Sequence, residues 1–542
     1  MHDTTNMVII APGFVAASVS LSPALQLEAK AVRESEWWST SAYSNKSHCQ
    51  WNGIKCNDEG SVTEINMGWV YVGEKYWKFN FSSFPNLVRL DLFYTGLRGS
   101  IPVEIGTLSK LTYLDLFSNS LTGELPLSLT NLTQLVLFDI SDNLITGFIP
   151  NELGKLKNLR QLNLSSNEFS GPIPSSLGFL TNLTLLNLYS NEINGSIVSE
   201  IGMLKNLEYL YIENNKITGQ IPVSLGNLTD LVDLVLSSNQ INGFIPPEIG
   251  NLKNLKDFYI DNNKITGPIP TSLCHLTKIV TLVLSSNQIN GSISPEIGHL
   301  TKMETLDLSH NQISGSIPVE IGHLTKMETL DLSYNQISGS IPVEIASCSS
   351  LGNLSLRHNY LTGSIPSQIR NLNLLHQIDL SYNNLTGSIP LYFVNLDFYL
   401  SNNSLKGQIP DCLKNRPSFR FIGNKDLCGD IKGFSPCPPS SKTMRQVKIL
   451  VPLMGFFALL LLGYFFHSRL RVRKIQSESV KTKDGDMFSI WNYDGNIAYE
   501  DIIKVTEDFD IRYCIGTGGY GRVYKAQLPS GKVVALKKLH RF

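Results

Sequence analysis

The sequence has no excess of either charge and few cysteines. It carries 45 basic and 46 acidic residues among 542, so its overall charge does not favour a nucleic acid or a strongly acidic or basic partner. Its eight cysteines are too few for a disulfide-built core, and four of them form close pairs, Cys49 with Cys56 and Cys428 with Cys437. Because a chain of this length cannot fold around one compact core, its function has to be sought locally.

A 24-residue pattern recurs along most of the chain, and Leu111 to Gln134, LTYLDLFSNSLTGELPLSLTNLTQ, is typical of it. In each unit, regularly spaced leucine or isoleucine precedes an asparagine, and a glycine follows four residues later. This pattern matches LxxLxLxxNxL at a period within the range of leucine-rich repeats. The ladder asparagines are Asn119, Asn143, Asn167, Asn191, Asn215, Asn239, Asn263, Asn287, Asn311, Asn335, Asn359 and Asn383.

Each unit predicts one short strand. Leucines such as Leu114 and Leu116 should point inward, while Tyr113, Asp115 and Phe117 alternate outward. The asparagine amide can pair with backbone groups of adjacent turns that would otherwise be buried without a partner. We therefore expect an α/β leucine-rich-repeat solenoid with parallel strands on its concave face.

Both ends of this array need covers, because the first and last units would otherwise expose apolar surface and open strand edges. An amphipathic helical stretch that ends at Trp37 and Trp38, together with a Cys49–Cys56 bridge, would cover the first unit. We expect a signal peptide at 1–24, an N-terminal cap at 25–86, about 14 repeats at 87–418, and a C-terminal cap with a linker at 419–446. For the first 24 residues, a misassigned start of the chain is the alternative.

Asparagine glycosylation sequons lie only in the first part of the chain, as expected of an extracellular segment, although asparagine-rich repeats also create sequons by chance. They begin at Asn45, Asn80, Asn131, Asn163, Asn182, Asn194, Asn227, Asn290, Asn353, Asn384 and Asn402.

Residues 449–466, ILVPLMGFFALLLLGYFF, predict a single transmembrane helix. They contain no charge and would give roughly 27 Å of helix, about the thickness of a bilayer core. A buried helix of a soluble protein is the alternative. The following segment, 467–508, begins with more basic residues than flank the other side, so the repeats should lie outside the cell and 467–508 in the cytoplasm.

Ligand specificity should depend on the outward strand positions, because the leucines, glycines and ladder asparagines are explained by the scaffold. One set of outward positions is richer in tyrosines and carboxylates than the neighbouring repeats, and we call it the acid and tyrosine patch. Its members are Tyr189, Tyr209, Tyr211, Glu213, Asp233, Asp257, Tyr259 and Asp261. A second cluster contains His310, Tyr334, Arg357, His358 and Tyr382. We expect an extended peptide to lie across these strands, the alternative being a merely solvated face.

The last stretch, 509–542, predicts the start of a protein kinase domain. Gly516, Gly518 and Gly521 form GxGxxG, Val523 follows, and VALK contains Lys537, with Lys538 as the fallback. The glycines would cover the phosphates of ATP, and Lys537 would pair with the α and β phosphates. No HRD or DFG motif follows before Phe542, so no catalytic residue and no protein metal ligand is expected, and the chain as written should be inactive.

The repeats LTGELPLSLTNLTQL and ITGFIPNELGKLKNL resemble the plant-specific class of leucine-rich repeat found in receptor-like kinases. The caps and AYEDIIKVTEDFDIRYCIGTGGYGRVYKAQLPSGKVVALKKLH are similar to the male-discoverer-interacting receptor-like kinase group. The resemblance implies a plasma-membrane serine/threonine kinase that uses ATP and Mg²⁺. It further implies an extracellular peptide ligand, a co-receptor kinase of the somatic-embryogenesis type, and a Cys428–Cys437 staple in the C-terminal cap.

Two hypotheses follow. In the first, the protein is such a kinase and its sequence continues past Phe542. In the second, it is a kinase-dead or binding-only leucine-rich-repeat receptor or decoy. A secreted protein similar to polygalacturonase inhibitors is disfavoured by the apolar segment 449–466.

Overall fold

A computed structural model describes residues 22–38, 47–73, 78–438, 505–507, 510–518, 521–527, 531 and 533–539. The chain divides into two compact units, residues 1–385 with 396–403, and residues 386–395 with 404–542. Each unit is considered by itself below.

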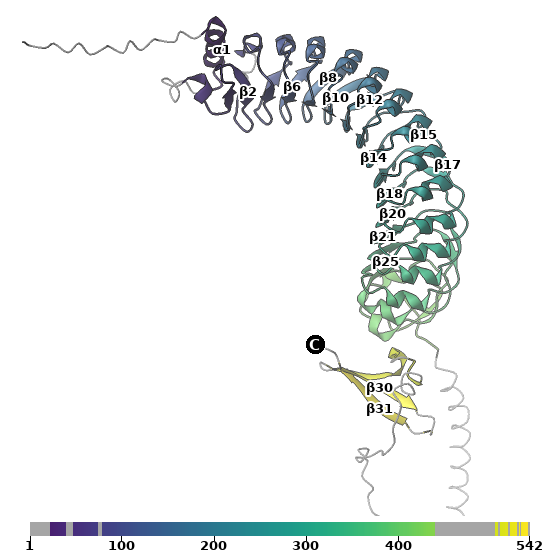
Figure 1. The fold of residues 1–542 in the computed structure, drawn as a ribbon. Coiled ribbons are helices and arrows are strands. Elements are labelled where there is room, and N and C mark those ends of the chain that lie inside the picture. Colours follow the sequence, from purple (N-terminus) through teal and green to yellow (C-terminus); the bar gives the residue numbers. More distant parts are fainter. Residues whose placement is uncertain are drawn as a thin grey trace, which may run out of the picture. The chain divides into compact units, whose positions relative to one another are not determined.

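A 16-stranded sheet runs through the first unit and confirms the predicted solenoid of parallel strands (Figure 1). Only the β1–β2 pair is antiparallel. From β3 to β25 each strand pairs with the strand of the next repeat at an offset of 24 residues, as in Leu114 with Phe138. In sheet order the strands are β1 (Ile54–Cys56), β2 (Val62–Asn66), β3 (Arg89–Asp91), β5 (Tyr113–Asp115), β7 (Leu137–Asp139), β9 (Gln161–Asn163), β11 (Leu185–Asn187), β13 (Tyr209–Tyr211), β14 (Asp233–Val235), β16 (Asp257–Tyr259), β18 (Thr281–Val283), β20 (Thr305–Asp307), β21 (Thr329–Asp331), β23 (Asn353–Ser355), β25 (Gln377–Asp379) and β26 (Asp397–Tyr399).

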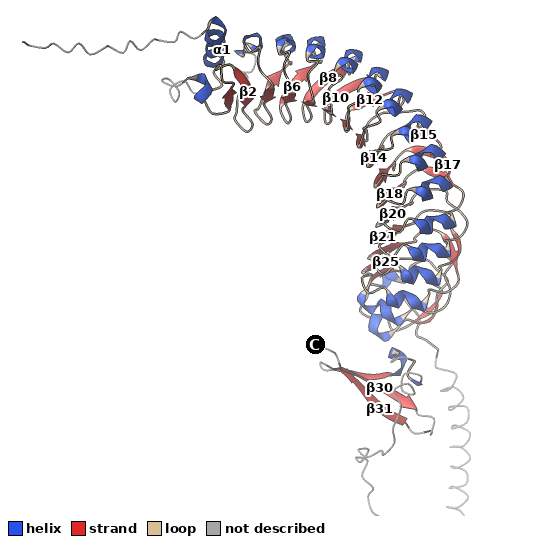
Figure 2. Cartoon of the chain, in the orientation of Figure 1, coloured by secondary structure: helices blue, strands red, loops and turns tan. Residues whose placement is uncertain are grey.

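Short 3₁₀ helices form the opposite side of each repeat, so that in the first unit the sheet lines the inner side of the curve and the helices its outer side (Figure 2). Proline precedes most of them in extended conformation, as Pro150 does at φ −65°. Within the repeats of the first unit these helices are Val103–Thr107, Leu127–Asn131, Asn151–Lys155, Ser175–Phe179, Ser199–Met203, Val223–Asn227, Pro247–Asn251, Thr271–His275, Pro295–His299, Val319–His323, Val343–Ser347 and Ser367–Asn371.

A second set of short strands follows the ladder asparagines on one flank. It forms small parallel sheets made of β4 (Arg98–Gly99), β6 (Ser120–Gly123), β8 (Leu144–Phe148), β10 (Glu168–Pro172) and β12 (Glu192–Asn194), then of β15 (Asn242–Gly243), β17 (Lys264–Pro268) and β19 (Gln288–Asn290), and then of β22 (Ser338–Ser340) and β24 (Tyr360–Thr362). The sequence pattern predicts a second segment here but not its pairing.

The ladder asparagines join successive turns from inside. The Oδ1 atom of Asn167 accepts a hydrogen bond from the Ile145 amide at 3.0 Å, and its Nδ2 donates to the carbonyls of Ile140 at 2.9 Å and Ser165 at 3.1 Å. Its side chain is buried, like the leucines around it. Because each side-chain amide pairs with backbone groups of two turns, the asparagine stabilises the turn in which the chain leaves the strand.

The N-terminal cap begins with α1 (Pro23–Glu34), whose first turn is capped by Ser22. The predicted helical stretch up to Trp38 is therefore shorter in the structure, because Ser35 ends the helix and Glu36 adopts a left-handed φ of 60°. β1 and β2 lie within the stretch assigned to the cap, and β2 pairs directly with β3, so the main sheet continues into the cap. The short 3₁₀ helices His48–Gln50 and Phe81–Ser83 complete this region.

The second unit contains the 3₁₀ helices Leu391–Asn395, Asp411–Leu413 and Ser418–Arg420, and the parallel pair β27 (Lys406–Gln408) and β28 (Asp426–Cys428). Asn424 accepts a hydrogen bond from the Leu405 amide at 3.0 Å, as a ladder asparagine does. The same unit contains the 3₁₀ helix Ile511–Tyr513 and an antiparallel sheet of β29 (Cys514–Gly518), β30 (Gly521–Gln527) and β31 (Val533–Leu539).

Within the described residues, no helix has both the length and the apolar character needed to cross a bilayer. The predicted transmembrane segment 449–466 lies outside those residues, as do most of the predicted signal peptide, nearly all of 467–508 and the sequon at Asn45.

Candidate ligand-binding face of the repeats

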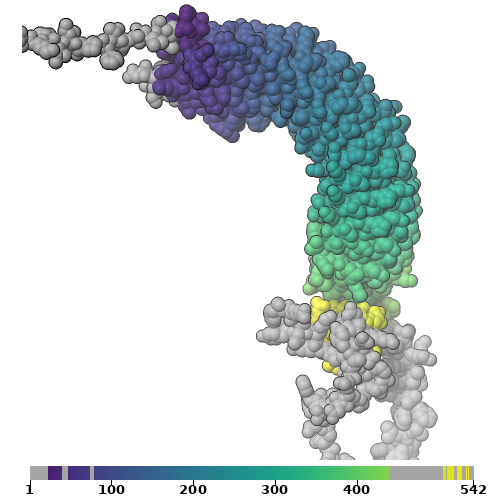
Figure 3. Space-filling model, viewed as in Figure 1, coloured from purple at the N-terminus to yellow at the C-terminus, as the bar shows by residue number. Residues whose placement is uncertain are grey.

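The acid and tyrosine patch lies on neighbouring strands of the main sheet. Tyr209, Asp233 and Asp257 occupy one register row across β13, β14 and β16, and Tyr211 and Tyr259 belong to the next outward row. Tyr189, Glu213 and Asp261 follow the carboxyl ends of β11, β13 and β16. Figure 3 shows the repeats of the first unit as one continuous surface, in which these residues belong to the stretch coloured from blue to teal. All eight side chains are partly or fully exposed to solvent.

Hydrogen bonds already join parts of this patch. The Tyr211 hydroxyl donates to the Asp233 carboxylate at 2.8 Å, and the Ser237 hydroxyl donates to Asp261. Burial raises the pKa of Asp233, with the neighbouring Asp257 carboxylate adding to the rise and the Tyr211 hydrogen bond opposing it. The rings of Tyr209 and Tyr211 lie with their centroids 6.3 Å apart. The patch therefore presents fixed rings and fixed acceptors rather than freely rotating side chains.

Glu213 differs from the other carboxylates of the patch. Its Oε2 atom is buried and has no hydrogen-bond partner. Burial raises the pKa of Glu213 to about 7, because water cannot stabilise its charge. A ligand that brings a donor or a cation to this carboxylate would supply the missing partner.

The second cluster forms a stacked column. The ring centroids of His310 and Tyr334 lie 4.2 Å apart, those of Tyr334 and His358 4.6 Å, and those of His358 and Tyr382 4.1 Å. Arg357 lies over the rings of Tyr334 and Tyr382 at 5.5 and 5.1 Å. Because the faces are used by the stack, this column offers mainly ring edges to a partner.

Sequence reasoning missed a third group of aromatic residues near the start of the array. Trp69, Tyr71 and Tyr94 are 70%, 75% and 54% exposed, and Trp69 contacts both Phe93 and Tyr94. They lie before or within the first repeat, where the 24-residue pattern is not yet established. A search for aromatic residues near glycines could have found this group, since Gly73 and Gly96 lie beside the Tyr71 ring and Gly68 lies beside the ring of Phe93.

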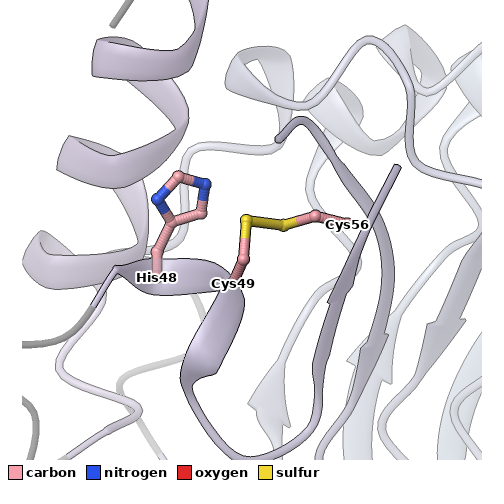
Figure 4. Close-up of side chains that lie close together, drawn as sticks. All are labelled: His48, Cys49 and Cys56. Carbon is pink, nitrogen blue, oxygen red and sulfur yellow. A yellow bond between two sulfur atoms is a disulfide. The ribbon is translucent and has the colours of Figure 1, made fainter. Parts of the chain in front are cut away.

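The N-terminal cap brings His48, Cys49 and Cys56 together (Figure 4). This trio has the donor types of a metal site, but the two sulfurs form a disulfide and so supply no thiolate. His48 is buried, and its Nε2 lies 3.9 Å from Oε2 of Glu28. Glu28 in turn accepts hydrogen bonds from the Ser61 hydroxyl and the Val62 amide, which ties α1 to β2. A second disulfide joins Cys428 and Cys437, while Cys274, Cys348, Cys412 and Cys514 are free.

The predicted nucleotide residues lie on the three-stranded sheet of the second unit. Gly516 and Gly518 belong to β29, Gly521 and Val523 to β30, and Lys537 to β31. Gly518 pairs with Gly521, and the backbone of Val523 pairs with that of Lys537. The glycine-rich stretch is thus a hairpin, and the lysine strand lies beside it.

Comparison with known proteins agrees with the repeat architecture. The family profile described as "Leucine-rich repeat region" matches residues 78–216 and 223–358, and the profile "Leucine Rich Repeat" matches 206–228, 350–372 and 374–396. Parallel strands, ladder asparagines and these matches define a leucine-rich-repeat solenoid. The chain belongs to the leucine-rich repeat family.

Its relatives include plant receptor kinases. MDIS1-interacting receptor like kinase 2 of Arabidopsis thaliana is 41% identical over 138 residues, which is 23% of this chain and 13% of that kinase. LRR receptor-like serine/threonine-protein kinase ERL2 of the same plant is 33% identical over 125 residues, which is 22% of this chain and 13% of the kinase. The matches thus span about an eighth of these curated relatives.

Solved structures of plant receptors have a similar fold. The ectodomain of the Arabidopsis thaliana membrane receptor kinase GASSHO1/SCHENGEN3, in complex with CASPARIAN STRIP INTEGRITY FACTOR 2, matches with a TM-score of 0.56 and 35% identity, over 66% of this chain and 49% of that one. A TDR receptor matches with a TM-score of 0.53 and 31% identity, over 65% of this chain and 70% of that one.

Proposed function

We propose that this chain is part of a cell-surface receptor-like serine/threonine kinase of plants, whose repeats bind an extracellular peptide. In this proposal the acid and tyrosine patch from Tyr189 to Asp261 is the ligand site. The chain crosses the plasma membrane once at 449–466 with the repeats outside, and a co-receptor kinase of the somatic-embryogenesis type completes the signalling complex.

The observation that supports this proposal best is the composition of the patch. Four carboxylates and four tyrosines occupy adjacent outward positions, and one buried oxygen of Glu213 lacks a donor. An extended peptide could bring amide and basic donors to several of these acceptors as it crosses the strands. Similarity to receptor kinases supports the same role, because the ectodomain of one structural relative is bound to a separate factor, CASPARIAN STRIP INTEGRITY FACTOR 2.

The intracellular part of the proposal depends on the glycine-rich hairpin. Gly516, Gly518 and Gly521 would cover the phosphates of ATP, Val523 would follow the loop, and Lys537 on the neighbouring strand would hold the α and β phosphates. Mg²⁺ would be held by other kinase segments. Serine/threonine phosphorylation is therefore proposed for the whole receptor.

A panel of random extended nonapeptides, screened against the full chain in detergent micelles, would test the ligand site. We expect peptides selected for binding to lose on the order of tenfold in affinity when Asp233 and Asp257 are both replaced by alanine, because hydrogen bonds to charged groups contribute about 1.5–3 kcal/mol. Calorimetric titration of each selected peptide measures this change.

Asp307→Ala is the matched control, since Asp307 lies on the same face in β20 but outside the patch. Equal affinities for the native chain and the Asp233→Ala/Asp257→Ala variant would contradict the proposed site. The second candidate, a binding-only receptor or decoy, predicts the same peptide binding without phosphate transfer. A transcript that continues in frame into HRD and DFG motifs would exclude it.

A further inference from the structure

One edge of the first unit carries a left-handed residue in every repeat, immediately before the ladder position. From Ser118 to Ser286 all eight of these residues are serine, asparagine or aspartate, with φ between 51° and 56°. Small polar side chains tolerate this conformation well, whereas bulky ones do so rarely. Ring-bearing residues occupy the equivalent turns at both ends of the array: Trp69 and Tyr94 at φ 67° and 52°, and the stacked column of His310, Tyr334, His358 and Tyr382 at φ between 52° and 57°. The fold does not require aromatic rings here, so these positions call for another explanation.

The four side chains Trp69, Tyr71, Phe93 and Tyr94 form what we call the aromatic platform, whose residues follow the carboxyl ends of β2 and β3 in the chain. The ring centroids of Trp69 and Tyr94 lie 4.5 Å apart, and Trp69 meets Phe93 edge-on at 5.5 Å. Trp69, Tyr71 and Tyr94 are each more than half exposed. Aromatic groups gathered in this way on a surface mark an interaction site more often than chance placement does.

Glycines hold two of these rings against the backbone. A Cβ on Gly96 would lie 2.5 Å from the Tyr71 ring, and one on Gly73 would lie 2.9 Å from it. A Cβ on Gly68 would lie 2.2 Å from the ring of Phe93. The Tyr71 ring therefore lies close against bare backbone on one side, while most of its surface remains open to solvent. Because the backbone fixes the ring, little side-chain entropy remains to be lost on binding.

The platform carries no charge. The two turns that build it, residues 67–73 and 92–96, contain no acidic or basic side chain. The nearest strand charges, Arg89 and Asp91 in β3, pair with each other at 2.6 Å. Within the described part of the chain, the indole N–H of Trp69 and the hydroxyls of Tyr71 and Tyr94 make no hydrogen bond. The surface thus combines exposed aromatic rings with three polar atoms that make no hydrogen bond within the described residues, on two turns that contain no charged side chain.

We propose that the aromatic platform binds a neutral polysaccharide in the form of an extended chain of β-linked pyranose units. The C–H face of a pyranose packs against an aromatic ring, and its hydroxyls exchange hydrogen bonds with an indole N–H and phenol hydroxyls. Trp69 and Tyr94 come from consecutive turns, which stack at about 4.8 Å in a parallel sheet. This spacing is comparable to the advance per sugar along an extended β-linked chain. The four platform residues offer a charged peptide no ion-pair partner, and they follow β2 and β3, whereas the acid and tyrosine patch lies at β11 to β16.

Calorimetric titration of the full chain, in detergent micelles, with cellohexaose tests this proposal. We expect saturable binding that weakens roughly tenfold or more in Trp69→Ala and separately in Tyr71→Ala, since each substitution removes an aromatic stacking surface. The acidic hexamer of galacturonic acid should bind more weakly than cellohexaose, because the platform offers no cation.

Phe148→Ala is a matched control. Phe148 is 67% exposed and its ring also lies against a glycine, Gly171, but no other ring stacks on it within the described residues. Unchanged cellohexaose affinity in this variant, together with the losses in the platform variants, supports the proposal.

Three outcomes would overturn it. The first is the absence of cellohexaose binding by the native chain, and the second is equal affinity in Trp69→Ala. The third is that the native chain does not bind cellohexaose but self-associates with increasing concentration, and that Trp69→Ala abolishes this self-association. That result would assign the platform to contact with a second copy of the chain. The melting temperatures of all variants establish that folding is intact.

Discussion

At the scale of single residues, the buried polar groups of the repeats divide into those with complete hydrogen bonding and those without. Asn167 pairs with backbone groups of two turns, and its side chain is fully used by the scaffold. Glu213 is a carboxylate on the concave side, and one of its oxygens is buried without a donor. Leaving such a group unpaired costs free energy, and a ligand that donates a hydrogen bond to it would recover that cost.

The burial of Glu213 should make the stability of the folded chain depend on pH. Its pKa rises from an ordinary value of 4.5 to about 7 in the folded chain. Between these values the unfolded chain has lost the proton while the folded chain keeps it, so stability should fall as pH rises from about 4.5 to 7. Glu213→Gln should remove this dependence. Above pH 7 it should stabilise the repeat by on the order of 1 kcal/mol, less than the full shift implies because solvent screens a partly exposed group.

Hydrogen exchange of residues 207–230, measured at pH 5 and pH 8, tests whether stability falls as the pH rises. The native chain should lose protection at pH 8 relative to the variant, after correction for the intrinsic exchange rate. The same pH dependence in both proteins would contradict a raised pKa at Glu213. Glu192→Gln, at an exposed acid in β12, serves as the control substitution.

At the scale of the single turn, the ladder asparagine is the element that links one repeat to the next. Asn167→Ala would leave the Ile145 amide and the Ile140 carbonyl buried without their partner. Each lost partner costs about 1–3 kcal/mol, so we expect a local destabilisation of roughly 2–4 kcal/mol. Urea denaturation followed by hydrogen exchange in residues 140–170 measures the loss.

Asn194→Ala is the comparison for this change. Asn194 ends β12 and is exposed, so its removal should alter stability by less than about 0.5 kcal/mol. Similar losses in the two variants would mean that asparagine content, rather than the ladder geometry, determines stability.

Sequence periodicity predicts the elements that repeat and fails where the chain departs from the period. The strands and ladder asparagines follow from the 24-residue spacing, because one side of each strand has to be apolar. Strands β1 and β2 precede the regular repeats, so the 24-residue spacing alone does not predict that the main sheet continues into the cap. The end of α1 was placed too late because the amphipathic pattern continues past the turn at Ser35 and Glu36.

The candidate site was predictable only in part. Outward positions such as Asp233 and Asp257 follow from strand alternation, and their adjacency follows from the register. The missing donor at Glu213 depends on the packing of neighbouring side chains, which periodicity does not describe. The aromatic platform depends on where glycines leave room for rings, which is a property of the folded backbone.

At the scale of the whole molecule, each repeat contacts mainly its neighbours, so stability should be local rather than global. The N-terminal cap offers a test, because the Cys49–Cys56 bridge closes a loop at the first strand. Cys49→Ser/Cys56→Ser should destabilise the cap by about 2 kcal/mol. Faster hydrogen exchange should be confined to the first repeats, and residues 255–380 should keep their protection.

Lys30→Ala, at an exposed position of α1, controls for substitution at the same end. A uniform loss of protection along the array in the disulfide variant would mean that the solenoid unfolds as one cooperative body. Intrinsic fluorescence of the cap tryptophans Trp37, Trp38 and Trp51 reports its opening independently, since all three are buried there.

The parallel sheet has a mechanical consequence. Its backbone hydrogen bonds point from one repeat to the next, along the direction in which the repeats are stacked. Tension applied between the two ends of the first unit would therefore open the sheet one turn at a time, as in peeling, instead of shearing many bonds together. Such a structure yields gradually under load, with an extension that grows in steps of 24 residues.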